Sequence, residues 1–271
     1  MQNRLSLFQI GIAGLAIIFS SCQKDLGTVK QTDEVMGTPL PGQITYCRIE
    51  SIWEKNGQFG QEYRIIGYDE YENPTFISTP MVTTGSPFRT FKYDTWHRLK
   101  EYREEYTAGG FFSWHKYFYD NNGRIGADSS YSMGAFSEGA PDFYLSKALT
   151  VFEYDNQNRI IRTVTNIGPG TIFPGFPSTT TFIGESTYDA AGNLVKPGVT
   201  YDNKMNLHRT NDIWMFLARD YSVNNPFIAT SYNSTGLPTS INISGPLNFL
   251  NSTDIFLNSS EIGYSCRPAH W

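Results

Sequence analysis

The chain of 271 residues is mildly acidic, with a formal net charge of −5, and it has no block of basic residues. This balance argues against nucleic acid and anionic lipid as partners. The hydrophobic content of 39% and charged content of 17% fit a folded globular chain and exclude a disordered one. The length suits one sizeable all-β domain, and the aromatic content of 15% favours strands.

The first residues predict a lipoprotein signal peptide over 1–21. Arg4 gives a positive charge, and the apolar run from Leu5 to Phe19 is too short for a comfortable membrane span. The run ends in Phe19-Ser20-Ser21-Cys22, which resembles the lipobox of bacterial lipoproteins. The resemblance implies that Cys22 becomes the lipidated N-terminus, anchored in the outer membrane of a bacterium. The alternative is an ordinary secretory signal followed by a chance cysteine.

A flexible tether is predicted over residues 22–43. This segment contains Gly, Pro and Thr, and its apolar residues follow no helical or strand period. Its start, Gln23-Lys24-Asp25-Leu26, partly resembles the surface-export signal of Bacteroidetes lipoproteins. That resemblance implies display on the cell surface, with the periplasmic face of the outer membrane as the alternative. The folded domain then covers residues 44–271.

After the tether, one heptad beginning with Tyr-Asp or Tyr-Asn recurs. Its seven copies begin at Tyr68, Tyr93, Tyr119, Tyr154, Tyr188, Tyr201 and Tyr232. In the copy YDNNGRI, Asp120 can bond the backbone two residues on, and Gly123 tolerates a positive φ. The pattern predicts a type I turn followed by a left-handed residue, which is a common hairpin connection.

In that hairpin register Asp120 pairs with Arg124, and Asp155 pairs with Arg159. A calcium loop would need several converging oxygen ligands, whereas DNNG supplies one carboxylate, so a turn is predicted and no metal site. Three copies place an unfavourable residue at the left-handed position, and their turns are expected to differ. These residues are Glu72, His97 and Met205.

The heptads resemble the YD repeats of RHS-type proteins, whose unit reads Tyr-Asp-x-x-Gly-Arg-Leu, and the resemblance covers about Cys47 to Cys266. Together with the lipobox and the tether, the chain resembles a family of uncharacterised Bacteroidetes lipoproteins described as having a porin-like β fold. The repeat spacing predicts an all-β fold, an antiparallel up-and-down meander of repeated hairpins that forms a curved sheet or a barrel. All Tyr-Asp turns should lie at one end of it.

One segment departs from the strand pattern. Residues 211–219 begin with the N-cap candidate Asn211 and carry apolar residues at 213, 214, 216 and 217, which predicts a short helix. The helix should pack on or into the sheet and end before Asn225-Pro226. A helical membrane anchor is the alternative.

Two Gly/Pro-rich inserts, 128–146 and 166–181, are predicted to form long loops at the end away from the Tyr-Asp turns, where binding is common. Their aromatic residues are the candidate binding residues: Tyr131, Phe136, Phe143, Tyr144, Phe173 and Phe176. The alternative is that the loops only cover an open end. Four tryptophans could also stack on sugars or pack across strands: Trp53, Trp96, Trp114 and Trp271.

The sequence predicts no catalytic residues, no cofactor and no metal. Its four histidines do not have metal-ligand spacing, and it contains neither a GxSxG elbow nor a P-loop. Cys47 and Cys266 lie in the first and last predicted strands and can form a disulfide in an exported chain, or remain free thiols.

We therefore expect a non-catalytic cell-envelope lipoprotein that binds a glycan or protein partner through the inserts. A structural or assembly component without a ligand is an alternative, as is a glycan-processing enzyme with a carboxylate pair from distant strands.

Overall fold

The computed structural model describes residues 45–57, 60–79, 87–107, 109–137, 139–172, 179–242 and 259–268. Almost all of their regular structure is antiparallel β, which confirms the predicted fold class. They all belong to one unit, Gly37–Trp271. The predicted signal peptide, 1–21, and the predicted tether, 22–43, lie outside the described residues.

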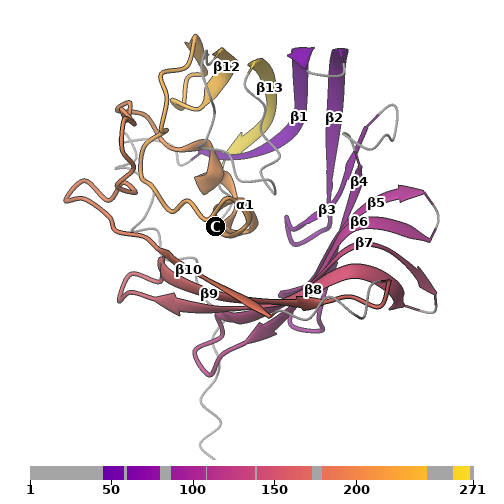
Figure 1. Cartoon of the computed structure of the whole chain (residues 1–271). Coiled ribbons are helices and arrows are strands. Elements are labelled where there is room, and N and C mark those ends of the chain that lie inside the picture. Colours follow the sequence, from indigo (N-terminus) through magenta and orange to yellow (C-terminus); the bar gives the residue numbers. More distant parts are fainter. Residues whose placement is uncertain are drawn as a thin grey trace, which may run out of the picture. The chain divides into compact units, whose positions relative to one another are not determined.

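Thirteen strands form one sheet in the order β10-β9-β8-β7-β6-β5-β4-β3-β2-β1-β13-β12-β11 (Figure 1). The strands are β1 (Thr45–Gly57), β2 (Gly60–Tyr68), β3 (Pro74–Ser78), β4 (Phe88–Tyr93), β5 (Leu99–Thr107), β6 (Gly110–Tyr119), β7 (Ile125–Ser137), β8 (Ala140–Tyr154), β9 (Ile160–Pro169), β10 (Thr180–Glu185), β11 (Ser231–Tyr232), β12 (Pro238–Asn242) and β13 (Ser259–Pro268). The helical segments are the 3₁₀ turn η1 (Leu207–Thr210) and the helix α1 (Asp212–Ala218).

Strands β1 to β10 form the predicted meander, and the sheet is a curved open sheet, not a closed barrel. The last strand, β13, pairs with the first strand, β1, and β12 and β11 then extend the sheet on that side. The first and last strands are therefore neighbours without closure. Within the described part of the chain, β10 and β11 are the two edges.

A disulfide joins β1 to β13. Cys47 and Cys266 lie directly opposite each other in the antiparallel register, and their Cα atoms are 4.1 Å apart. Of the two states that the sequence left open for these residues, the structure therefore has the bonded one. The bridge spans a sequence separation of 219 residues, so it links the two ends of the described domain.

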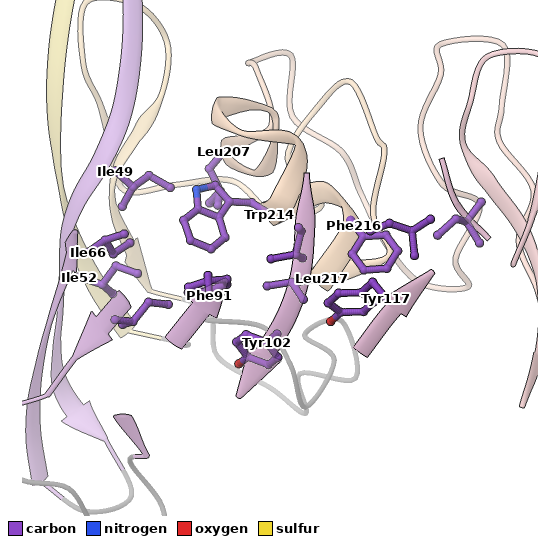
Figure 2. Packing of buried hydrophobic residues seen from close by; sticks show 14 of the residues in the cluster. Ile49, Ile52, Ile66, Phe91, Tyr102, Tyr117, Leu207, Trp214, Phe216 and Leu217 are labelled. Atoms are coloured by element: carbon purple, nitrogen blue, oxygen red, sulfur yellow. The ribbon is translucent and has the colours of Figure 1, made fainter. Parts of the chain in front are cut away.

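The hydrophobic core lies between one face of the sheet and α1, around which the strands bend (Figures 1 and 2). Trp214 meets Phe91 of β4 edge-on at 5.8 Å, and Phe216 meets Tyr117 of β6 and Phe152 of β8 at 5.3 and 5.5 Å. We call the sheet face that carries these strand residues the inner face, and the opposite one the outer face.

The helix lies within the predicted range 211–219 and confirms its sequence signals. Asn211 is the N-cap, and its side chain accepts a hydrogen bond from Ile213 N. The helix ends at Ala218, before Asn225-Pro226, because Arg219 adopts a left-handed conformation with φ 52°. The guanidinium of Arg219 lies 4.3 and 4.1 Å from the ring centroids of Phe152 and Phe216, contacts that hold this unusual C-cap.

Six of the seven Tyr-Asp or Tyr-Asn heptads form the predicted turn. Their fourth residue after the tyrosine has a positive φ: Glu72, His97, Gly123, Asn158, Gly192 and Gly236. In the DNNG copy, Gly123 N donates to Asp120 O, and the Asp120 carboxylate accepts from Asn122 N and Arg124 N. The predicted pairs Asp120–Arg124 and Asp155–Arg159 are also present, at 2.8 and 2.7 Å.

The expectation that Glu72 and His97 would break the pattern was wrong, because tertiary contacts hold both residues. The Glu72 carboxylate pairs with Arg48 and Arg267, and the His97 ring stacks on Tyr71 with centroids 3.6 Å apart. Met205 does depart from the pattern. In that copy Asn225, from elsewhere in the chain, bonds the Asp202 carboxylate.

A second set of contacts joins each heptad to the next, and the sequence did not predict it. Tyr93, Tyr119 and Tyr154 donate hydrogen bonds to the carbonyls of Pro74, Leu99 and Ile125, each located six residues after the preceding heptad tyrosine. The guanidiniums of Arg98, Arg124 and Arg159 lie 4.1 to 4.6 Å from the ring centroids of the next heptad tyrosines. We call these repeated contacts the Tyr–Arg ladder.

The ladder carboxylates make a pH-dependent contribution to stability. Burial raises the pKa of Asp94, Asp120 and Asp155, but hydrogen bonds from the backbone and side chain of the following arginine outweigh it and leave each pKa below its ordinary value. A carboxyl whose pKa is lower folded than unfolded stabilises the fold above its unfolded pKa of about 3.9. That stabilisation is lost as the pH falls through the folded pKa.

We therefore expect a chain with Asp94→Asn, Asp120→Asn and Asp155→Asn to be less stable than wild type at neutral pH. It should also lose less stability between about pH 5 and acid pH, because these groups no longer take up protons on unfolding. Urea unfolding at a series of pH values measures both effects. A matched chain with Glu50→Gln, Asp142→Asn and Glu185→Gln removes three exposed carboxylates outside the ladder; an equal change of slope in that chain would contradict the assignment.

Candidate functional site

The ladder and α1 occupy the end of the sheet that carries the Tyr-Asp turns, which leaves the opposite end as the place for a binding site. Strands β7 and β8 form a long hairpin, with 13 and 15 residues. They contain most of the first predicted insert. The prediction of a long loop over 128–146 was wrong. The two strands stay paired as far as Ser137 and Ala140, and Gly139 with φ 78° lies in the connection.

The Gly-rich composition that suggested a loop has a different cause. A Cβ on Gly134 would lie 2.2 Å from Phe143 O and 2.6 Å from the Phe111 ring, so only glycine permits this close packing. The second insert, 166–181, is partly strand as well, because β9 runs to Pro169 and β10 begins at Thr180. Phe173 and Phe176 lie outside the described residues.

Three of the candidate binding aromatics pack within the chain. The Tyr131 ring meets Tyr144 edge-on at 4.9 Å, and Phe136 meets Trp114 at 5.5 Å. Trp114 is fully buried, with the guanidinium carbon of Arg103 3.9 Å from its ring centroid, so it has no free face for a sugar. This outer-face aromatic cluster therefore stiffens the hairpin.

Of the other tryptophans, Trp96 is 72% exposed in a turn and Trp53 is 36% exposed on β1, whereas Trp271 lies outside the described residues.

Beyond that cluster the hairpin exposes apolar side chains. We define the tip patch as Met133, Phe143, Leu145 and Ile172, which are between 39% and 50% exposed. The pairing of Gly134 with Tyr144 places Met133 and Leu145 beside each other across β7 and β8. Ile172 lies close to this part of β8, where its backbone N donates to Tyr144 O at 3.2 Å. Phe143 is thus the one predicted binding residue that the structure leaves half-exposed within such a patch.

The inner face carries a polar array that the sequence analysis missed. Arg89 binds Glu104 at 3.1 Å, Tyr102 donates to the same carboxylate, and Ser113 donates to its other oxygen. His115 Nδ1 lies 2.9 Å from Asp128 Oδ2. Further hydroxyls follow in cross-strand pairs, Ser132 with Ser146 and Thr150 with Thr165.

The electrostatics of the array are balanced. Burial lowers the pKa of Arg89, but Tyr102 and Glu104 outweigh it, so the pKa of the guanidinium lies above its ordinary value and the group stays charged. Arg89 Nη1 and Asp128 Oδ1 are buried and have no hydrogen-bond partner among the described residues. Because Arg89 and Glu104 neutralise each other, this part of the array suits a neutral polar ligand or ordered water better than an ion.

A signal for this array does exist in the sequence. Arg89 lies two residues before Phe91 on β4, and Glu104 lies two residues after Tyr102 on β5. Residues two apart on a strand share a face, so both charged residues point to the inner face with these aromatic residues.

Comparison with known proteins assigns the chain to no family. No protein-family model matches the sequence, and no curated protein matches it. Among the described residues, no group of three or more His, Cys, Asp or Glu side chains is arranged to hold a metal ion. None of the described helices is long and apolar enough to cross a membrane.

Proposed function

We propose that this protein is a non-catalytic, lipid-anchored protein of the bacterial outer membrane that binds a protein partner through the tip patch. The observation that carries the proposal is the group of half-exposed apolar side chains at the end of β7 and β8. Contiguous exposed apolar side chains commonly mark protein interaction sites. The lipobox at Cys22 and the tether over 22–43 support a location at the envelope, on the cell surface or its periplasmic side.

The fold supports binding at this end. The Tyr–Arg ladder fixes the opposite end, and the packed rings of Tyr131, Phe136 and Trp114 hold the base of the hairpin rigid. A rigid hairpin loses little conformational entropy when it binds, which favours affinity. The tip patch then presents Phe143, an aromatic anchor of the kind that concentrates binding energy at interfaces.

The patch favours a protein over a glycan, because its side chains offer no hydroxyl, amide or charge to a sugar. A glycan is the second candidate, and the inner-face polar array is the observation that favours it, since neutral sugars bind through many hydrogen bonds. In that case Asp128→Asn should lower binding on a glycan array, whereas tip-patch variants should not. If neither surface binds anything, the structural or assembly role remains as the explanation.

The test uses the full chain in its own envelope, with a photo-activated cross-linking side chain at position 143. We expect one specific cross-linked protein, and the combined change Phe143→Ser and Leu145→Ser should weaken its binding by about a hundredfold, as loss of an interface anchor does. The matched control is Val195→Ser with Ile228→Ser, which removes two apolar side chains elsewhere that are at least as exposed. A Cys22→Ala chain, which cannot receive lipid, should be missing from the membrane fraction.

Equal binding by the tip and control variants would overturn the tip-patch assignment. Correct membrane retention of the Cys22→Ala chain would overturn the lipid anchor separately. Both variants should keep the wild-type circular dichroism spectrum, because the altered side chains are exposed.

A further inference from the structure

The open edge of the sheet at β10 lacks the usual protection. All six residues from Thr180 to Glu185 are exposed, and they include neither proline nor lysine. Within the described residues, β9 covers one side of this strand and no strand covers the other. Glu185, at the end of the strand, is its one charge, and exposed edges without lysines, prolines or bulges tend to pair with another strand.

The hydrogen bonding shows which backbone groups face outward. Ser186 N donates to Ile161 O at 2.8 Å, and this pair continues the β10–β9 register. In an antiparallel ladder, alternate residues direct both backbone groups to the same neighbour. The even-numbered residues of β10 therefore bond β9, and Thr181, Ile183 and Glu185 direct their N–H and C=O groups to the open edge.

An apolar row on the outer face leads to this edge. The register places Phe118, Ala127, Val151, Val164 and Ile183 side by side across β6 to β10. Phe118 is 54% exposed, Val151 42% and Ile183 58%. The row ends at Ile183, the middle of the three residues whose backbone groups face outward.

We propose that two copies of this chain pair through β10, antiparallel, with Ile183 opposite Ile183 of the partner subunit. A two-fold axis perpendicular to the sheet keeps the inner faces of both copies on the same side. Because side chains alternate between the two faces, residues that face each other across the dimer must both have odd numbers or both have even numbers. The register centred on Ile183 matches every outward residue, because Thr181 then faces Glu185 of the partner subunit and the reverse. Each such pair exchanges two backbone hydrogen bonds.

The two neighbouring symmetric registers, centred on Phe182 and on Gly184, fit less well. The first would place Ile183 opposite Thr181 of the partner subunit, and the second would place it opposite Glu185 of the partner subunit. Each would also leave one outward residue of β10 opposite a residue beyond the strand. The apolar row would then be broken at the junction.

Side chains also match in the register centred on Ile183. The apolar row continues from one copy into the other, and Phe182 faces Gly184 of the partner subunit, an arrangement in which an aromatic ring covers a glycine. The two Glu185 carboxylates are four residues apart along the strand, roughly 13 Å, so their repulsion is screened. These matches arise only when the second strand is another β10, which is why we assign the edge to a second copy.

The first test is cross-linking of the full chain in detergent with Ile183→Cys and a short thiol-specific reagent. Facing Cα atoms in such a pair are about 5.5 Å apart, so we expect an efficient covalent dimer. Mixing Thr181→Cys chains with Glu185→Cys chains should cross-link them to each other far more than either to itself. The wild-type chain gives the background, and Ile228→Cys, at an exposed site away from β10, is the positional control.

The second test is sedimentation over a range of concentrations. We expect wild type to dimerise reversibly and Ile183→Lys to weaken the dimer by at least about tenfold, because it places two like charges at the centre. Ile228→Lys should leave dimerisation unchanged. The proposal is overturned if wild type stays monomeric, if Ile183→Lys dimerises as well as wild type, or if Ile228→Cys cross-links as efficiently as Ile183→Cys. Tip-patch variants should dimerise normally, which separates this surface from the proposed partner site.

Discussion

Replacing Trp214 by alanine is expected to lower the free energy of unfolding by about 3–5 kcal/mol, the range for a large aromatic side chain removed from a core. Trp214 is 1% exposed on α1 and packs edge-on against Phe91 (Figure 2). The helix has only seven residues, so its stability comes from this packing and not from its own hydrogen bonds. Loss of the indole should loosen the whole inner face.

Urea unfolding followed by circular dichroism measures the change. Trp96→Ala is the matched control, since Trp96 is 72% exposed and its main contact is with Arg98; this change should cost less than about 1 kcal/mol. Trp214→Phe, which keeps much of the volume, should fall between the two. Similar losses for Trp214→Ala and Trp96→Ala would mean that α1 does not organise the core.

Local features of the fold could be predicted from the sequence because they depend on neighbouring residues. The Tyr-Asp turns follow from the bonding of an aspartate to its own turn and from a tolerated positive φ at Gly123. The start of α1 follows from the Asn211 cap. The left-handed cap that ends α1 could not be predicted, because Arg219 is held in it by tertiary contacts with Phe152 and Phe216.

Features that depend on distant residues were missed or misread. The insert at 128–146 was predicted as a loop because glycine is common in loops, but glycine also occurs in strands where another group packs closely. The close approach of Phe111 to Gly134 can be recognised only once the strands are paired. The Arg89–Glu104 pair joins neighbouring strands across 15 residues, and its one local mark is that each residue lies two positions from an inward aromatic residue. The candidate binding residues of the first insert therefore lie on a hairpin of two long strands and not on a loop.

The Tyr–Arg ladder explains why the heptad contains an arginine as well as a turn. Arg124 closes its own turn through Asp120 and also lies over Tyr154 of the next heptad. Burial raises the pKa of Tyr154 to about 12, so its hydroxyl remains a donor to Ile125 O at neutral pH. One heptad thus contacts the next through side chains as well as through the sheet, which gives the turn end a rigidity that the far end does not require.

Removal of the disulfide with Cys47→Ser and Cys266→Ser is expected to lower the free energy of unfolding by about 2–5 kcal/mol, towards the upper part of the range for disulfides because the bridged segment is long. The bridge limits the unfolded chain across 219 residues and holds β13 against β1. β12 and β11 reach the rest of the sheet only through β13. Amide exchange in the variant should therefore increase first in β11 to β13.

Reduction of the wild-type chain should reproduce the loss seen in the double variant, whereas a reductant should not change the variant itself. This comparison isolates the bridge from any effect of the serines, and Cys22 is common to both chains. The bond also bears on location, because it persists in the oxidising envelope and not in a reducing cytoplasm. Rapid alkylation of both thiols in folded protein taken from the envelope, with an unchanged unfolding midpoint on reduction, would show that β1 and β13 hold together without it.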